Sequence, residues 1–262
     1  MSDNPTILYT ISGPIATITL SRPEVYNALN AQLHRELMAA LRRAERDPAV
    51  RCVVIIGTGK AFCSGQDLRE FADLGQSLDI GARLRESYNP LVHMIRRMGL
   101  PVIAAVNGPA VGAGMSLALA CDFRVAAMSA SFSAAFVNIG LIPDSGMIYF
   151  LPRLIGQARA LELCITGTTI DATTAKEWGL VNLLAADDDF PQAVRQFAEA
   201  LADRPSATIS LIKRALEMSQ YSDLAQVLEY EAQAQVVAGA HPDFVEGAVS
   251  YTHLTLPTKR IV

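Results

Sequence analysis

Two short segments combine glycine with other small residues where apolar runs end. Ala61–Leu68 (AFCSGQDL) follows the apolar run Cys52–Gly57, and Asn107–Gly114 (NGPAVGAG) follows Pro101–Val106. A strand-to-helix turn leaves backbone N–H groups without partners, and ligands of α/β sheets bind at the carboxyl ends of strands. The two turns could therefore direct two N–H groups at one oxygen atom, which is the arrangement of an oxyanion hole.

The glycines in these segments have a second interpretation, because glycine after a strand more often serves a turn or close packing than catalysis. Gly112 and Gly114 do not begin a G-x-G-x-x-G fingerprint, since position 117 is leucine. A dinucleotide site is therefore not indicated. The residue types alone leave both an oxyanion hole and ordinary turns open.

One acidic residue, Asp144, lies in the segment Ile142–Gly146 (IPDSG). A positioned carboxylate can take a proton from one carbon and return it to another. Aspartate between proline and serine is also a favoured turn or N-cap residue, and this is the simpler interpretation of the residue types. Cys63 has no histidine near it in the sequence, so a thiolate nucleophile is not indicated.

Alternating strands and helices must position these segments. The runs Thr6–Ser12 and Ile15–Leu20 predict a β-hairpin. Cys52–Gly57 and Pro101–Val106 are apolar throughout, as strands buried on both faces are. Because helical patterns separate these strands, we expect parallel pairing with right-handed crossovers, and hence an α/β fold.

The pattern also predicts how the chain is divided. Apolar residues recur at helical spacing from Leu33 to Ala44, with Asn30 as the N-cap. We expect residues 1–190 to form the α/β core and residues 191–248 to form a helical C-terminal part. The last residues, 249–262, are rich in threonine, carry a proline and fit neither part, so we interpret them as a non-native tail.

The composition narrows the range of partners. A chain of 262 residues with 51% hydrophobic content can bury a sizeable core. Its net charge of −4 and the absence of a basic run argue against nucleic acid or an anionic membrane as the partner. The N-terminus has no signal-peptide pattern, and four scattered cysteines predict reduced thiols in a cytoplasmic protein. The four histidines have no ligand spacing, so we expect no metal site.

Several longer segments follow one another in a recognisable order. They are Arg22–Asn30 (RPEVYNALN), Ala61–Leu68, Asn107–Ala120, Phe123–Ala127, Gly140–Asp144 and Glu177–Val181. In this order they resemble the crotonase (enoyl-CoA hydratase/isomerase) superfamily, whose segments read RPxxxNALN, AFxxGxDL and NGxxxGxGxxLAL. The resemblance extends over nearly the whole chain up to Gly247. It implies a ββα-spiral core, homotrimers or dimers of trimers, and an acyl-CoA thioester substrate.

The same resemblance implies site residues. The backbone N–H groups of Gln66 and Ala113 would form the oxyanion hole. Coenzyme A would lie along Val25, Ala28, Ala61, Ser64, Asp67, Leu68, Gly112 and Pro143, in large part through backbone atoms. Asp67 also looks like the residue that caps the helix after the first turn. Coenzyme A enters as part of the substrate, so no separate cofactor is expected.

The resemblance also bears on the reaction. Hydratases of the family carry two glutamates, one to activate water and one to deliver a proton, and these positions fall at Ser116 and Phe136. The segments around Asp144 and Ser64–Leu68 resemble the epoxyphenylacetyl-CoA isomerases of phenylacetate catabolism and related Δ3,Δ2-enoyl-CoA isomerases. There the aspartate is the acid/base, although Met147 stands where these relatives usually have glycine. We therefore predict an acyl-CoA isomerase, with a hydratase or a non-catalytic acyl-CoA-binding scaffold as alternatives.

Overall fold

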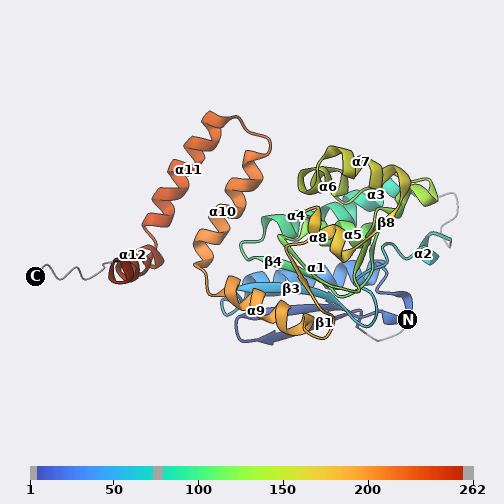
Figure 1. Ribbon diagram of the computed structural model, residues 1–262, viewed down its shortest axis with the longest axis horizontal. Coiled ribbons are helices and arrows are strands. Elements are labelled where there is room, and N and C mark those ends of the chain that lie inside the picture. The colour runs from blue at the N-terminus through green and yellow to red at the C-terminus, as the bar shows by residue number, and fades with distance from the viewer. Residues whose placement is uncertain (1–4, 73–78, 256–262) are drawn as a thin grey trace, which may run out of the picture. The chain divides into compact units, whose positions relative to one another are not determined.

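The structure is a computed structural model that describes residues 5–72 and 79–255. The chain divides into two compact units, Met1–Asp203 and Arg204–Val262 (Figure 1). In the described ranges, no helix is both long and apolar enough to cross a membrane.

The first unit is built on a six-stranded sheet of order β1-β2-β3-β4-β6-β9. Its strands are β1 (Ile7–Ser12), β2 (Ile15–Leu20), β3 (Cys52–Gly57), β4 (Val102–Val106), β6 (Phe123–Ala127) and β9 (Leu183–Ala185). The hairpin β1–β2 is antiparallel, and every later pairing is parallel. The predicted hairpin and the parallel pairing of the apolar strands are thus confirmed.

A smaller sheet stands beside the first. Its strands, in the order β5-β7-β8, are β5 (Ala110–Val111), β7 (Ser131–Ser133) and β8 (Thr169–Asp171). Strand β5 lies within the second glycine-rich segment, and an isolated bridge joins Ala110 to Cys63 of the first segment. This bridge therefore connects the first segment to the edge of the small sheet.

Helices cover the sheets and connect the strands. They are α1 (Ala31–Arg46), α2 (Arg69–Ala72), α3 (Ile80–Arg83), α4 (Asn89–Arg97), α5 (Ala113–Ala120), α6 (Met147–Ile155), α7 (Gln157–Thr166), α8 (Ala172–Glu177) and α9 (Phe190–Ala202). Two 3-10 turns, η1 (Pro23–Val25) and η4 (Ala135–Ile139), and a π-helical turn, η3 (Leu84–Tyr88), complete the unit. Helix α1 begins as predicted, because the Asn30 side chain accepts a hydrogen bond of 2.8 Å from the N–H of Leu33.

The two faces of the large sheet carry different helices, as the alternation of side chains along a strand requires. Val53 and Ile55 of β3 belong to the larger apolar cluster, which contains α1 and α5. Cys52 and Val54 belong to a second cluster, with Val194 and Ala198 of α9. Because α9 buries its apolar side against the sheet, the compact unit extends beyond residue 190, where the sequence pattern places the end of the core, to Asp203.

The second unit contains α10 (Ser206–Ser219), α11 (Leu224–Gly239) and α12 (Pro242–Thr255). Its helical nature agrees with the sequence pattern, and Asp223 starts α11 with a capping box. No residue of α10 or α11 is buried. Helix α12 continues through Val249 to Thr255, so the segment predicted to be a tail begins as helix, and residues 256–262 lie outside the described residues.

Candidate active site

Backbone hydrogen bonds join the two glycine-rich segments. The N–H groups of Phe62 and Cys63 donate to the carbonyl of Pro109, at 3.1 and 3.2 Å. In return, the N–H of Val111 donates to the carbonyl of Cys63 at 2.9 Å. The turns predicted to meet at one edge of the sheet therefore lie directly against each other.

Glycine is required where the turns touch, since there is no room for a side chain. A Cβ atom on Gly65, where φ is +96°, would lie 2.8 Å from the carbonyl oxygen of Val111 and 3.4 Å from the nitrogen of Ala113. A Cβ atom on Gly114 would lie 2.1 Å from the carbonyl oxygen of Cys63. This close contact brings the peptide that precedes Gln66 next to the start of α5.

The N–H groups of Gln66 and Ala113 remain available. Leu29 pairs with the residues on either side of Gln66, since it donates to the Gly65 carbonyl and accepts from the N–H of Asp67. Ala113 is the first residue of α5, where N–H groups have no partner inside the helix. Within the described residues, neither N–H donates to a protein acceptor.

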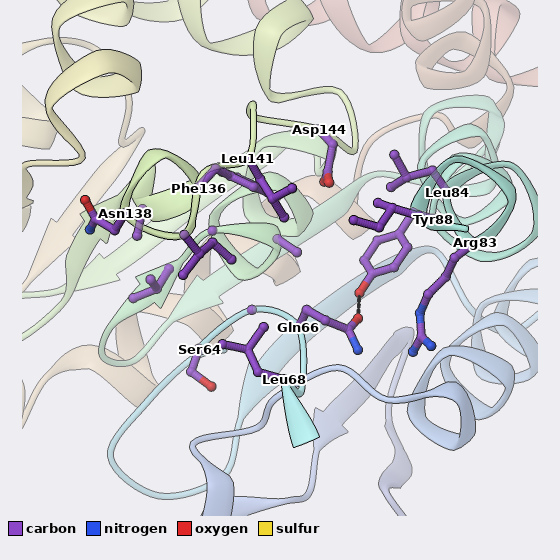
Figure 2. A pocket seen from close by; sticks show the side chains of 17 residues that line it. Ser64, Gln66, Leu68, Arg83, Leu84, Tyr88, Phe136, Asn138, Leu141 and Asp144 are labelled. Atoms are coloured by element: carbon purple, nitrogen blue, oxygen red, sulfur yellow. Dashed lines mark hydrogen bonds between the residues drawn. The ribbon is translucent and has the colours of Figure 1, made fainter. Parts of the chain in front are cut away.

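Gln66 and Ala113 line a cavity of about 240 Å³. Figure 2 shows the side chains around it. Its apolar lining includes Leu68, Ile80, Leu84, Phe136, Ile139 and Leu141. Polar side chains come from Ser64, Gln66, Arg83, Tyr88, Asn138 and Asp144. Apolar walls with a few polar groups are typical of a site for a small ligand.

Asp144 is the one carboxylate among the described residues that line this cavity. Its Oδ1 accepts a hydrogen bond of 2.7 Å from the hydroxyl of Ser145, whose φ of +53° turns the chain before α6. Burial raises the pKa of Asp144 above its ordinary value, and the Ser145 hydrogen bond offsets part of that rise. A carboxyl group of raised pKa at an apolar cavity suits proton transfer.

The simpler interpretation of Asp144 as an N-cap does not hold. Helix α6 begins after Gly146, which is its N-cap and makes no side-chain capping bond. Asp144 contributes its backbone carbonyl, which accepts from the N–H of Met147 at 3.0 Å. Met147 itself is fully buried in the core and does not line the cavity.

Ser116 and Phe136 are the residues at which the resemblance places the two hydratase glutamates. Ser116 is fully buried in α5, and its hydroxyl donates to the backbone carbonyl of Asp144 at 3.0 Å. Phe136 is buried and lines the cavity, with its ring 4.0 Å from where a Cβ atom on Gly112 would lie. Neither residue carries a carboxylate, so Asp144 is the one carboxylate at the cavity among the described residues.

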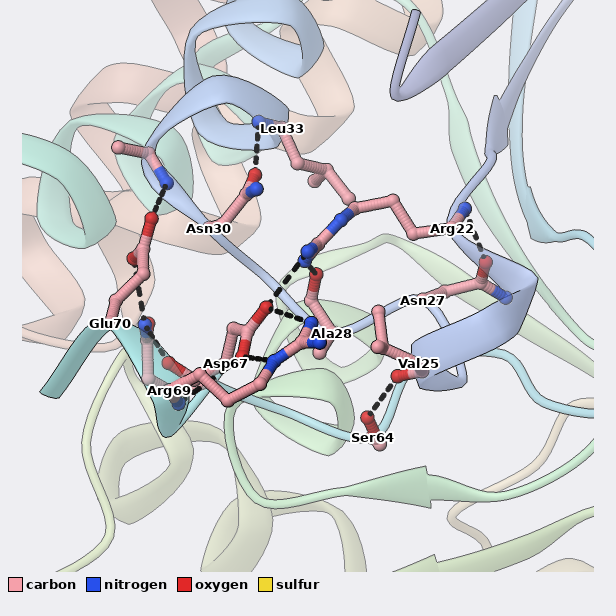
Figure 3. A network of polar contacts seen from close by, with 12 residues as sticks. Arg22, Val25, Asn27, Ala28, Asn30, Leu33, Ser64, Asp67, Arg69 and Glu70 are labelled. Atoms are coloured by element: carbon pink, nitrogen blue, oxygen red, sulfur yellow. Dashed lines mark hydrogen bonds and ion pairs between the residues drawn. The ribbon is translucent and has the colours of Figure 1, made fainter. Parts of the chain in front are cut away.

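Val25, Ala28 and Ser64, three of the residues predicted to contact coenzyme A, lie near one another (Figure 3). The hydroxyl of Ser64 donates to the carbonyl of Val25 at 3.1 Å, and the side chain of Asn27 donates to the carbonyl of Ala61 at 2.8 Å. Ala28 and Ala61 are buried. Ser64 lines the cavity, whereas Val25, Ala28 and Ala61 do not.

Asp67 caps and braces the first turn, as its structural interpretation predicts. Its carboxylate accepts hydrogen bonds from the N–H of Arg69 at 3.2 Å and from the guanidinium groups of Arg69 and Arg22, each at 2.8 Å (Figure 3). Hydrogen bonds from Arg69, and then from Arg22, hold the pKa of Asp67 well below its ordinary value. Any contact of Asp67 with coenzyme A is therefore expected through its backbone.

The remaining residues predicted to contact coenzyme A also divide into those that line the cavity and those that do not. Leu68, which is half exposed, and Gly112 line the cavity, whereas Pro143 is buried and does not.

Cys63 is fully buried, and burial raises the pKa of its thiol to about 12. It therefore stays protonated, in agreement with the argument against a thiolate nucleophile.

Sequence patterns missed three polar residues of the cavity, which are Arg83, Tyr88 and Asn138. The Tyr88 hydroxyl donates to Oε1 of Gln66, and Arg83 forms an ion pair with Glu70. In the sequence, Arg83 and Tyr88 lie in a stretch with only a helical pattern, where a tyrosine most simply packs in the core. The partners are far apart in the sequence, so no local signal could have revealed them.

The fold and cavity define the class of the protein: an α/β protein with a cavity at the carboxyl ends of parallel strands. A sequence model of the enoyl-CoA hydratase/isomerase family matches residues 10–256. The chain belongs to this family and has the crotonase fold, as predicted. It is therefore an enzyme that acts on CoA thioesters.

Individual relatives agree on the family and differ in activity. The chain is 45% identical over 246 residues to a protein of Rhodobacter capsulatus named "Probable enoyl-CoA hydratase", with 94% of each chain covered. It is 39% identical over 247 residues to the 1,2-epoxyphenylacetyl-CoA isomerase of Escherichia coli K12, again with 94% of each covered. The crystal structure of an enoyl-CoA hydratase from Bacillus anthracis superposes with a TM-score of 0.88 at 33% identity, covering 97% of this chain and 98% of that chain.

Proposed function

We propose that the protein is an acyl-CoA isomerase in which Asp144 is the acid/base. The substrate is an enoyl-CoA or epoxyphenylacetyl-CoA thioester, and the reaction passes through an enolate. The observation that carries this proposal is that, among the described residues, one carboxylate lines the same cavity as Gln66 and Ala113, whose N–H groups have no protein acceptor there. Ser116 and Phe136 stand where the resemblance places the glutamates of a hydratase.

In the mechanism, the thioester oxygen accepts hydrogen bonds from the N–H groups of Gln66 and Ala113. The Asp144 carboxylate removes a proton from a carbon of the acyl chain, and the negative charge that develops on the oxygen faces the N-terminus of α5. The protonated Asp144 then returns the proton to another carbon. Each oxyanion donor is expected to lower the barrier by about 2.7–4 kcal/mol.

The raised pKa of Asp144 fits both halves of this cycle. A carboxylate with an ordinary pKa is a weak base toward carbon, and burial makes the ionised form of Asp144 more ready to accept a proton. One carboxylate suffices for a proton shuttle, because the same group takes and returns the proton.

Incubation with 3-enoyl-CoA and with 2-enoyl-CoA tests the proposal. We expect the wild type to interconvert the two thioesters and Asp144→Asn to abolish the interconversion. Chromatography and mass spectrometry of the thioesters monitor the reaction. The same assay with epoxyphenylacetyl-CoA decides between the two substrate classes and tests a place in phenylacetate catabolism. Failure to convert any of these substrates would rule out the isomerase.

The relative named as a probable hydratase favours a second candidate, an enoyl-CoA hydratase with water held by Asp144 alone. Formation of 3-hydroxyacyl-CoA from crotonyl-CoA, lost in Asp144→Ala, would select this candidate. Tight acyl-CoA binding in calorimetry without turnover would instead indicate a scaffold.

We propose that coenzyme A lies along one end of the first turn, where Val25, Ala28, Ala61 and Ser64 gather. From there it would reach Leu68, Gly112 and Pro143. The backbone of Asp67 would face the same ligand. Binding of CoA to Ser64→Trp, which should weaken because a large side chain blocks this path, checks the assignment by calorimetry.

We propose that the protein assembles as a homotrimer or a dimer of trimers through its second unit. Helices α10 and α11 of this unit expose large apolar side chains such as Ile212, Leu216 and Leu228. Light scattering of the full chain, and of a chain without residues 249–262, tests both the assembly and the tail. If the tail is non-native, the two masses should correspond to the same number of subunits.

The four cysteines are free thiols, which fits the proposed cytoplasmic location.

A further inference from the structure

The Gln66 side chain is held at both ends. Its Oε1 accepts the hydrogen bond from the Tyr88 hydroxyl, and its Nε2 lies 3.2 Å from both Oε2 of Glu70 and the carbonyl of Asp67. Figure 2 shows the Tyr88 ring reaching across to this amide. Gln66 therefore cannot change rotamer without breaking several hydrogen bonds, although the proposed mechanism uses only its backbone.

Tyr88 is itself rigidly placed. It ends the π-helical turn η3 and is only 5% exposed. Its ring packs edge-on against the ring of His34 of α1, with 4.2 Å between the centroids. Burial lowers the pKa of His34 to about 4, so the imidazole is neutral at physiological pH. Neither ring nitrogen has a hydrogen-bond partner in the part of the chain that the structure describes. His34 therefore serves as a packing surface that keeps the Tyr88 hydroxyl pointed at Gln66.

We infer that Tyr88 is a positioning residue for the oxyanion hole, which it aligns through the side chain of Gln66. This inference rests on the proposed function, in which the Gln66 N–H binds the thioester oxygen. The side-chain contacts add to the backbone hydrogen bonds that Leu29 makes on either side of Gln66, and they fix the peptide that follows Gly65, whose φ is +96°. A small misplacement of a catalytic group can reduce the rate about a hundredfold.

The surroundings of Tyr88 argue against a role in proton transfer. Burial raises the pKa of the phenol well above its ordinary value; Arg83 opposes the shift, while Asp144 and Glu70 add to it. The hydroxyl thus remains a neutral donor throughout the range in which the enzyme can be assayed. Loss of this donor should lower the rate by the same factor at every pH.

A double-mutant cycle tests the inference. Tyr88→Phe should lower kcat about tenfold, with KM within about twofold, because the substrate still binds but the oxyanion donor is less well aligned. Gln66→Ala keeps the backbone N–H and should produce a similar loss. Adding Tyr88→Phe to Gln66→Ala should then have no further effect, because the hydrogen bond is already absent.

Tyr9→Phe is the matched control. Tyr9 lies on β1, does not line the cavity, and its buried hydroxyl has no hydrogen-bond partner among the described residues. The same chemical change there should leave kcat unaltered. Melting temperatures of all variants separate a loss of fold from a loss of alignment. Should Tyr88→Phe fail to fold, a tenfold loss of kcat at constant KM in Gln66→Ala still supports the inference, and an unchanged kcat overturns it.

Three results would contradict the role of Tyr88. These are a wild-type kcat in Tyr88→Phe, fully additive losses in the double variant, and a displaced pH profile, which would mean that the phenol transfers protons. Asp144→Asn, assayed in parallel, separates this inference from the proposed function. If that variant is active, the isomerase mechanism itself fails; if it is inactive while Tyr88→Phe keeps the wild-type kcat, only the inference fails.

Discussion

The two sides of the cavity are built in different ways. The oxyanion side consists of backbone, with Cys63 and Gly65 of one turn packed against Val111 and Gly114 of the other at distances that exclude a Cβ atom. The opposite side consists of side chains, with the Asp144 carboxylate at an apolar wall. The backbone side should tolerate no added atom, whereas the side-chain side should tolerate changes of shape but not of chemistry.

The largest effect is expected at Gly114, on the backbone side. Gly114→Ala places a Cβ atom 2.1 Å from the carbonyl oxygen of Cys63, so the two turns must separate. We expect a loss of about 3 kcal/mol in the free energy of unfolding, together with all activity. Urea denaturation and the isomerase assay measure both. Gly239→Ala, where the new atom meets nothing within 4 Å, is the control and should be neutral or slightly stabilising.

On the side-chain side, Asp144→Asn should leave the fold intact and lower kcat by about 10²–10⁴, the usual contribution of a positioned general base. Because the carboxylate caps no helix, Asp144→Ala should be folded and inactive as well. A destabilised Ala variant beside an active Asn variant would restore the N-cap interpretation. Melting curves and turnover of the two variants distinguish these outcomes.

The pH dependence should report the same carboxylate. The base must be ionised, so activity should rise with pH through a midpoint above about 3.9, the ordinary value for aspartate. The raised pKa also means that the folded state favours the protonated form. Stability contributed by Asp144 is therefore present at low pH and lost as the pH rises through the folded-state pKa. Asp144→Asn should melt higher than the wild type at neutral pH, with the difference vanishing in acid; an equal difference at all pH values would refute this assignment.

The smallest effect is expected where the two sides are joined. Ser116, on the helix that begins with Ala113, donates to the backbone carbonyl of Asp144. Ser116→Ala should cost about 1 kcal/mol of stability and lower kcat by less than Asp144→Asn does, because the loop keeps its Met147 hydrogen bond. Thermal melting and single-turnover rates provide the check. A loss as large as that of Asp144→Asn would show that the two sides are not separable.

Local patterns in the sequence were enough for much of this architecture. The hairpin, the buried parallel strands, the Asn30 cap and the two glycine-rich turns all follow from neighbours a few residues apart. The turns can be located because the close approach of two backbones demands small residues. The small residues that this close approach requires can be read directly from the sequence.

Only the tertiary structure decided how side chains far apart in the sequence meet. Nothing near Tyr88 signals its bond to Gln66, and nothing near Asp144 shows that its carboxylate is spared from capping while its carbonyl is bound by Ser116. The C-terminal boundary of the core also depended on α9 packing against strands formed much earlier in the chain. Local sequence encodes backbone preference and the pattern of burial, whereas these contacts exist only after the sheet has brought distant segments together.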